Sequence, residues 1–584
     1  MSQIDPAFYL SLPPKEREKN LETLSIDDQA ILVLLTPWEQ RHEIILHSPN
    51  SRELVRGLPV EELFWTIKAS SPEDALAMFE LALPEQLQFM FDLDWWAKDQ
   101  LRPEKVLAWL VLLFENDRSV LVSWLTWILA QDYALVPAAL QPFLRVVKRP
   151  DDMDIQEARD TLPPFTLDDV YYISFRKQEL VPLLAEFLKE LLGISPGSYR
   201  DVMETLLWDT PTETLEHSYR MRCARLGSWG IPDYFDAIEI YAPLPEKRLK
   251  RRAFVQPAYE DIPLPVFVPT LYGLREGPLA EAVNALSGTS AMGRIVLEWT
   301  GAANKILVAD QVDWDDVSAL RSALEKVSSL LNLSLDHEKC LYGRKPVEVL
   351  THTTIEDLIH LANGIIRGLS KRARSLIREG LVPKDLIHLP EPWGLLVEGL
   401  SRDRPVLWNP VTEHHETPNS MGQIEEAEKR LLLVEDACRI MPCIEPHWST
   451  WEKAFPWSHT NLQDPRELLW PSAILTALAL WQLTGTLELA PIPRRMLPEL
   501  RRLWVPAETF PHEALETVET AMKSLADGIG LLASRSGIPA DRITRLIRTP
   551  FEETADALAG IPPGTEIDPR FLPTLLISMQ EDEV

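Results

Sequence analysis

Cysteine is scarce in this sequence. The 584 residues contain four cysteines at irregular spacing, Cys223, Cys340, Cys438 and Cys443. A secreted scaffold held together by disulfides needs a dense set of cysteines, so this class of protein is excluded. The sequence therefore predicts a protein of a reducing compartment, the cytoplasm.

Long apolar runs are also scarce. The first twenty residues contain Asp5 and the charged run from Lys15 to Lys19, so we expect no signal peptide. Leu468 to Leu487 is the only uncharged stretch long enough to cross a bilayer, but it contains Pro471 and Gln482. We interpret it as a buried helix and expect no integral membrane segment. The alternative interpretation is a membrane-associated subunit anchored by this stretch.

Basic residues are outnumbered, 58 against 88 acidic residues, and the formal net charge is −30. Such a charge repels phosphate backbones at long range, so a general nucleic-acid-binding protein is excluded. The densest basic cluster, Lys247 to Arg252, is short and is interpreted as a solvated linker. A protein is the partner that this composition favours.

Common catalytic motifs are missing from the sequence. It contains no phosphate loop ending in Gly-Lys-Ser or Gly-Lys-Thr, no zinc-protease histidine pair and no Gly-x-Ser-x-Gly elbow. Gly528 to Ala533 satisfies a relaxed dinucleotide pattern, but the residues before it have helical periodicity where that pattern needs a strand. We therefore expect no cofactor and favour a non-catalytic protein.

Short amphipathic helices are the pattern that is present. In Ser71-Pro72-Glu73-Asp74 the serine caps a helix, proline takes its first position, and the carboxylates face the positive end of the helix dipole. Similar starts at Pro59 and Pro84 lie about a dozen residues away on either side. This spacing predicts an N-terminal superhelix of short antiparallel helices.

The rest of the sequence is also mainly helical. One β-prone run, Val170 to Ile173, is either a strand or an extended connector. The fold class that we predict is mainly α, with minor β and a second helical domain. Its predicted parts are a helical-repeat superhelix at 1–150, a helical extension at 151–245, a basic and proline-rich connector at 246–270, a helical domain at 271–400 and a C-terminal helical domain at 401–580.

Two resemblances to known families support a helical fold. The phrases Ser-Pro-Glu-Asp-Ala-Leu at 71–76 and Leu-Pro-Glu-Gln-Leu-Gln-Phe at 83–89 resemble the helical repeats that precede the channel domain of magnesium-transporter proteins. This resemblance implies a cytoplasmic superhelix. The membrane helices of the channel have no counterpart in this sequence.

The wider resemblance is to an uncharacterised bacterial family, domain of unknown function 6178. It is carried by Phe-Asp-Leu-Asp-Trp-Trp at 91–96, Val-Tyr-Tyr-Ile at 170–173, Ala-Ile-Glu-Ile-Tyr-Ala-Pro-Leu at 237–244 and Ala-Asn-Lys-Ile-Leu-Val-Ala-Asp at 303–310. Because that family has no assigned activity, the resemblance implies no catalytic residue.

Two groups of residues are candidates for a metal site. Cys438, Cys443 and His447 offer thiolate and imidazole ligands for zinc, although their spacing is loose. The alternative is a buried cysteine that packs as a small apolar side chain. The acidic turn from Asp310 to Asp316 offers oxygen ligands, and helix capping is its alternative role. We expect no bound metal.

Tryptophans are the candidates for partner binding. Trp95, Trp96 and Trp109 belong to a cluster in the predicted repeats, and tryptophan is enriched in binding hot spots. Packing in the core is the alternative role. The function that we favour is a cytoplasmic protein-interaction or regulatory scaffold, and an enzyme with a site between the N- and C-terminal halves is the alternative.

Overall fold

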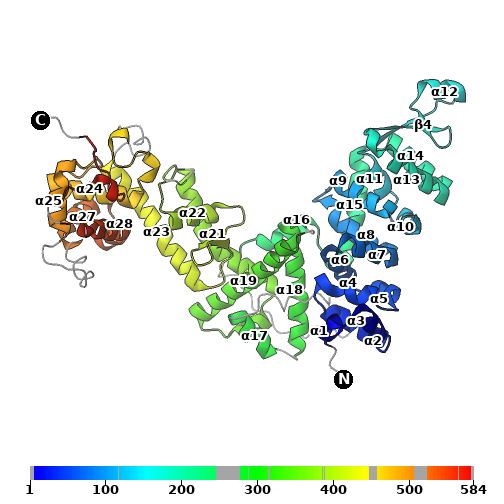
Figure 1. Cartoon of the computed structure of the whole chain (residues 1–584), viewed down its shortest axis with the longest axis horizontal. Helices are drawn as coiled ribbons and strands as arrows, with labels where there is room; N and C mark the ends of the chain where they lie inside the picture. The colour runs from blue at the N-terminus through cyan, green and yellow to red at the C-terminus, as the bar shows by residue number, and fades with distance from the viewer. Residues whose placement is uncertain are drawn as a thin grey trace. The chain divides into compact units, whose positions relative to one another are not determined.

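The computed structural model describes residues 5–115, 118–244, 277–286, 289–313, 316–383, 386, 388–445, 457–505, 522–562 and 565–580. Helices dominate these residues and the strands are few and short, which confirms the predicted mainly α class (Figure 1). The chain divides into two compact units. Unit 1 contains residues 1–242, 250–328 and 345–360, and unit 2 contains residues 243–249, 329–344 and 361–584. The predicted connector at 246–270 lies outside the described residues.

Unit 1 begins with a row of short helices. Within this row α4 packs against α6 and α7, and α6 packs against α8. The row consists of α1 Pro6–Ser11, α2 Pro14–Leu21, α3 Ile26–Leu35, α4 Trp38–Leu46, α5 Ser51–Gly57, α6 Val60–Ala69, α7 Pro72–Leu81 and α8 Pro84–Asp94.

The helix starts in this row follow local capping rules. The Ser71 hydroxyl accepts a hydrogen bond from the backbone N–H of Asp74 at 3.2 Å, which caps α7. At the start of α8, the Gln86 side chain accepts a hydrogen bond from the backbone N–H of Leu83 at 2.9 Å. Helix starts next to Pro59, Pro72 and Pro84 are therefore confirmed.

A hairpin and further helices continue unit 1. They comprise β1 Trp96–Ala97, β2 Gln100–Leu101, α9 Pro103–Glu115, α10 Arg118–Gln131, α11 Leu135–Leu140, α12 Ile155–Thr161, η1 Gln178–Leu180, α13 Val181–Ile194, α14 Pro196–Trp208, α15 Pro211–Ser228, α16 Tyr234–Ile238, η2 Glu239–Tyr241, α17 Pro278–Leu286, α18 Ser290–Ala309 and α20 Pro346–His352. Two longer helices, α19 Val317–Tyr342 and α21 Ile355–Arg378, contain residues of both units.

The β-prone run becomes the central strand of a small sheet. β5 Tyr171–Phe175 pairs antiparallel with β3 Leu144–Lys148 on one side and with β4 Phe165–Thr166 on the other. Ile173 lies opposite Val146 in this register and is fully buried. Because the neighbouring strands supply its hydrogen bonds, the run is a strand and not a connector.

Unit 2 is built around α23 and the mostly buried helix α24. Its elements are α22 Glu391–Ser401, β6 Leu407–Asn409, β7 His414–Glu416, α23 Met421–Ile444, η6 Trp457–His459, η7 Pro465–Glu467, α24 Trp470–Thr484, η8 Arg494–Met496, α25 Leu497–Trp504, α27 Ala526–Ser536, α28 Ala540–Gly560 and η9 Pro569–Phe571. β6 and β7 form a two-stranded antiparallel ladder.

The stretch that we interpreted from the sequence as a buried helix is α24. Its residues from Trp470 to Leu480 are all buried, because α23, α25, α27 and α28 pack around it. Gly528 of α27 permits this close packing, since a Cβ atom there would lie 2.6 Å from the ring of Trp481. Among the helices that the structure describes, none combines the length and apolar character needed to cross a membrane.

Candidate functional site

The three tryptophans predicted to bind a partner lie in the core of unit 1. Trp95, Trp96 and Trp109 are 0, 4 and 5 % exposed. Trp95 stacks on Phe91 with ring centroids 4.7 Å apart, and Trp124 meets its edge at 5.9 Å. Burial gives these rings a packing role, because a side chain at a partner-binding surface must be accessible. Partner binding through them stays a prediction that their positions do not support.

Two carboxylates at the end of α8 are buried beside these rings. Asp92 accepts hydrogen bonds from the Arg225 side chain, from Nε to Oδ2 at 2.7 Å and from Nη2 to Oδ1 at 2.9 Å. The Nε of Arg222 donates to the backbone oxygen of Asp92 at 2.6 Å. Both arginines belong to α15, so this pairing joins α8 to α15.

Arg225 also binds a second buried carboxylate. Its Nη1 donates to Oδ2 of Asp132 at 3.1 Å, so one guanidinium bridges residues that lie 40 positions apart, Asp92 and Asp132. Burial raises the pKa of Asp132 by more than the attraction of Arg225 lowers it. Burial also lowers the pKa of Arg222, whose guanidinium lies 5.5 Å from the ring centroid of Trp96. We infer that this network stabilises the packing of α8 against α15.

Asp94 takes part in a different set of contacts. Its Oδ2 accepts a hydrogen bond from Nε1 of Trp109 at 2.5 Å, and its carboxylate lies 3.5–3.6 Å from the cationic groups of Lys68, Arg102 and Lys105. Asp92 and Asp94 therefore pair with separate cations and do not share a proton. We call Asp94, Lys68, Arg102 and Lys105 the Asp94 cluster.

Exposed aromatic side chains lie just after α15 and in the first turn of α16. Trp229 is 48 % exposed and Phe235 is 59 % exposed. Gly230 takes a positive φ of 74°, which glycine adopts without strain. The backbone N–H of Ile231 bonds to Leu226 at 3.0 Å, and the Asn304 side chain donates to the Gly230 oxygen at 3.1 Å. The connection is thus fixed by hydrogen bonds on both sides.

The same surface continues onto the β1–β2 hairpin. The Tyr234 ring contacts Phe235 edge-on at 5.6 Å, and the ammonium of Lys98 lies 5.0 Å from the Tyr234 ring centroid. We call Trp229, Tyr234, Phe235 and Lys98 the aromatic surface. Sequence reasoning missed it. The available signal was Trp229-Gly230 followed by Pro232, a turn that carries a large ring directly after a helix.

The zinc candidates do not come together in the described residues. Cys438 and Cys443 both belong to α23, where their thiols bond to the carbonyl oxygens of Leu381 at 3.4 Å and Arg439 at 3.5 Å. His447 lies outside the described residues. Among those that are described, no three His, Cys, Asp or Glu side chains are placed to hold a metal ion.

Cys438 is expected to resist alkylation in the folded protein while Cys340 reacts. Cys438 is 2 % exposed and burial raises its pKa to about 12, whereas Cys340 is exposed. Because the thiolate is the reactive form, iodoacetamide at pH 8 should label Cys340 first and Cys438 only after unfolding. Peptide mass spectrometry over time measures the order, and a Cys340→Ser variant should lose the fastest step. Equal alkylation rates of Cys340 and Cys438 in the folded protein would contradict the burial of Cys438.

The acidic turn is used for capping and ion pairing. Oδ1 of Asp316 accepts hydrogen bonds from the backbone N–H groups of Ser318 at 2.9 Å and Ala319 at 3.0 Å, at the start of α19. Asp310 accepts a hydrogen bond from the Tyr241 hydroxyl at 2.8 Å and pairs with Lys326 at 2.7 Å. The capping alternative is therefore confirmed for Asp316.

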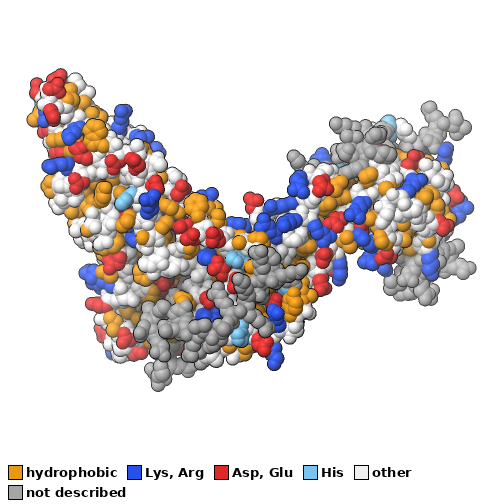
Figure 2. Space-filling model, turned by 180° about the vertical axis from the view of Figure 1, so that it is seen from behind, with side chains coloured by type: hydrophobic (Ala, Val, Ile, Leu, Met, Phe, Trp, Pro, Cys, Tyr) orange, Lys and Arg blue, Asp and Glu red, His pale blue; other side chains and the backbone are white. Residues whose placement is uncertain are grey.

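Charges of both signs are mixed on one face of the molecule. On the face drawn in Figure 2, acidic and basic side chains alternate with small groups of apolar ones. Mixed charge of this kind is typical of a solvated surface.

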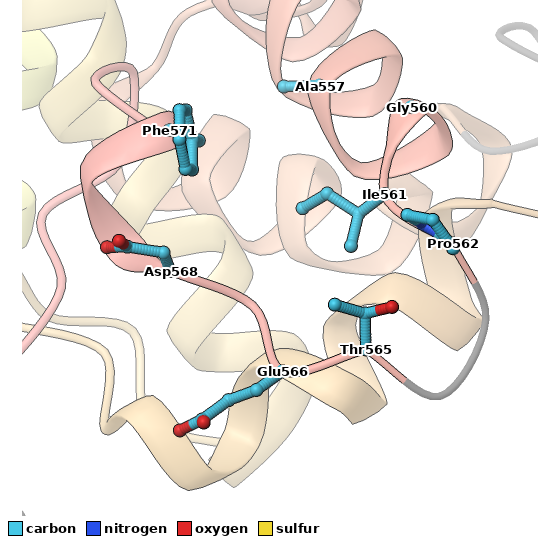
Figure 3. A pocket seen from close by; sticks show the side chains of 8 residues that line it. All are labelled: Ala557, Gly560, Ile561, Pro562, Thr565, Glu566, Asp568 and Phe571. Carbon is cyan, nitrogen blue, oxygen red and sulfur yellow. The ribbon is translucent and has the colours of Figure 1, made fainter.

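A pocket of about 490 Å³ in unit 2 has no catalytic set of residues. It lies between the end of α28 and η9, with Ile561 and Pro562 on one side and Glu566 and Asp568 on the other (Figure 3). Glu566 pairs with Arg494 at 2.6 Å, and hydrogen bonds and charge from Arg570 lower the pKa of Asp568 to about 2. Arg570 thus holds Asp568 in its charged form, and Arg494 pairs with Glu566.

Comparison with known proteins identifies a family but no characterised relative. A family model described as "Family of unknown function (DUF6178)" matches residues 18–578. No curated protein and no solved structure matches the sequence.

Proposed function

Since the chain belongs to this family of unknown function, we propose from its own structure that it is a non-catalytic, cytoplasmic interaction protein that binds a protein partner through the aromatic surface. The observation that carries the proposal is the exposure of two large rings: Trp229 follows α15 beside a turn fixed by hydrogen bonds, and Phe235 lies in the first turn of α16. Single exposed apolar residues are ordinary on soluble proteins. Two large exposed rings, one directly after α15 and the other in the first turn of α16, are a more specific feature.

Physical chemistry supports binding at such a surface. Tryptophan supplies a large apolar area, and a side chain on a fixed backbone loses less conformational entropy on binding. The ammonium of Lys98 at the rim favours a partner segment in which apolar side chains are flanked by acidic ones. The four cysteines, all free in the structure, agree with a cytoplasmic location.

We also propose that helices α3–α8 form a superhelical repeat. Helix starts near positions 60, 72 and 84 support a superhelical repeat, which is the fold implied by the resemblance noted in the sequence to the repeats of magnesium-transporter proteins. In this role the row is a rigid support, and the partner contacts the aromatic surface that follows it in the chain.

Replacing both rings of the aromatic surface tests the proposal. We expect a Trp229→Ala, Phe235→Ala variant to lose a partner captured by the native protein from extracts of its own organism, with binding weakened at least about 30-fold, the effect of losing a hot spot of about 2 kcal/mol. Trp208→Ala is the matched control, because Trp208 is 72 % exposed elsewhere in unit 1. Recovery of the same proteins by the native chain and the double variant would refute the proposal.

A further inference from the structure

Four exposed cations form a line along α21 in unit 2. They are Arg367, Lys371, Arg374 and Arg378, at positions i, i+4, i+7 and i+11 of the helix. With about 3.6 residues per turn and a rise of about 1.5 Å per residue, they fall within about 60° around the helix axis and extend over about 16 Å. The residues of α21 between them include no Asp or Glu. We call these four residues the basic stripe.

Contacts within unit 2 neutralise one cation of α21 outside the stripe but leave two cations of the stripe without a partner. Arg372 binds Glu435 at 2.8 Å and Glu428 at 3.0 Å, both on α23. By contrast, the side chains of Arg367 and Lys371 make no hydrogen bond or ion pair with any of the described residues. Like charges four positions apart destabilise a helix, so this pair needs a physical reason.

The helix end explains the other two cations only. Arg374 and Arg378 lie within about the last turn of α21, where the negative end of the dipole favours cations. They also lie 3.9 Å from Asp403 and 4.0 Å from Glu379, respectively. The effect of the dipole falls off within the last turn, and Arg367 lies about three turns before the end of the helix. Arg367 therefore has no role at the helix end.

A glycine beside the stripe exposes the backbone of α21. Gly368 is exposed, and a Cβ atom there would meet nothing within 4 Å. Glycine in an exposed helix interior is less stable than alanine. Gly364, one turn earlier, has a reason within the fold, because a Cβ atom there would lie 2.6 Å from the backbone oxygen of Leu244. Gly368 has no such neighbour among the described residues, which leaves room for a partner to approach closely.

We propose that the basic stripe and Gly368 dock an acidic α-helix of a protein partner. A helix with carboxylates at i, i+4, i+7 and i+11 repeats the spacing of the four cations, so each carboxylate can meet one cation. Gly368 lets the two helices pack closely, because the distance between packed helices depends on the size of the side chains at the contact. This surface lies in unit 2 and is separate from the aromatic surface of the proposed function.

Other acidic partners fit the stripe less well. Proteins that bind single-stranded nucleic acid stack its bases on aromatic rings, and the stripe contains none. A chain with a net charge of −30 also repels long phosphate backbones. An anionic membrane is a plane, whereas the stripe is a single line of side chains on one helix. A carboxylate-bearing helix matches both the charge and the shape.

Fluorescence anisotropy with two labelled peptides tests this proposal on the full-length protein. Both peptides are alanine-based helices with four glutamates, placed at i, i+4, i+7 and i+11 in the first and spread around the helix in the second. We expect the first peptide to bind at least about fivefold more tightly, because only its carboxylates can all meet cations at once. A Arg367→Gln, Lys371→Gln variant should weaken this binding at least about fivefold. Gly368→Leu, which keeps the charge but fills the space, should weaken it to a similar extent.

A matched variant separates the stripe from general charge effects. Lys15→Gln, Lys19→Gln also removes two exposed cations four positions apart, on α2, and should leave binding of the first peptide unchanged. Thermal unfolding of each variant establishes that it is folded. Equal binding of the two peptides, or undiminished binding by either stripe variant, would overturn the proposal. Tighter binding of phosphatidylserine vesicles or of a DNA duplex through the stripe would also overturn it. None of these results bears on the aromatic surface, whose test uses other residues.

Discussion

Replacing Asp92 with alanine is expected to lower the free energy of unfolding of unit 1 by about 3–5 kcal/mol. The carboxylate is 1 % exposed and is the direct partner of Arg225, whose guanidinium is 18 % exposed. Without Asp92, this guanidinium keeps one carboxylate, Asp132, and Gln88 loses the acceptor that it reaches at 2.8 Å. Arg225 thus loses one of its two carboxylate partners, and water replaces that partner poorly at a largely buried guanidinium.

Hydrogen exchange is the appropriate measurement, because a chain of two compact units need not unfold in one step. We expect faster exchange at the amides of α8 and α15 and little change in unit 2. Asp99→Ala is the matched control: Asp99 is exposed in the β1–β2 hairpin, and its loss should change stability by less than about 0.5 kcal/mol. An equal effect of the two variants would mean that the Asp92 network contributes no stability.

Replacing Asp436 with alanine should have an effect of similar size on unit 2, about 3–5 kcal/mol. Asp436 lies on α23 and is fully buried, and Nε of Arg542 on α28 donates to its Oδ2 at 2.7 Å. A second hydrogen bond joins Nη2 of Arg542 to the other carboxylate oxygen, so the pair is bidentate. The variant therefore removes a charged link between two helices that are 106 residues apart in sequence.

The pH dependence of this pair gives a second readout. Burial raises the pKa of Asp436 above its usual value of 3.8, despite the attraction of Arg542. The folded chain then binds this proton more tightly than the unfolded chain, so this group's contribution to stability falls as the pH rises from 3.8 through the raised pKa. We expect Asp436→Asn to lack that component. Chemical unfolding across this pH range measures it.

Asp541→Ala is the control for unit 2, because Asp541 is exposed on α28. Among the described ion pairs, its one partner is Arg545, one turn further along the same helix. Its loss should change the free energy of unfolding by about 0.5 kcal/mol or less. If Asp436→Ala were as stable as this control, the buried pair would contribute nothing to unit 2.

Local physical chemistry in the sequence determined where many helices begin. The Ser71 cap and the prolines at 72 and 84 act through bonds and dihedral angles of neighbouring residues, so no tertiary contact is needed to predict them. The buried character of α24 was also predictable, since a helix that is apolar all round must be enclosed.

Contacts with residues distant in sequence determined the strand at 170–173 and the burial of the tryptophans. The run at 170–173 became a strand because β3 and β4 lie on either side of it. Trp95 is buried because Trp124, 29 positions later, packs against it, whereas Trp229 remains exposed. Composition ranks both tryptophans alike, so the sequence alone could not tell which of the two is exposed.

The pairing of charged side chains also depends on contacts between distant parts of the chain. Asp92 and Asp94 lie two positions apart at the end of α8, but which cations they meet depends on how α6, α9 and α15 pack around α8. Helical periodicity fixes the direction of a side chain within its own helix. The residue that it meets belongs to another helix, and only the tertiary structure decides the distance between charges on which pairing, burial and ligand binding depend.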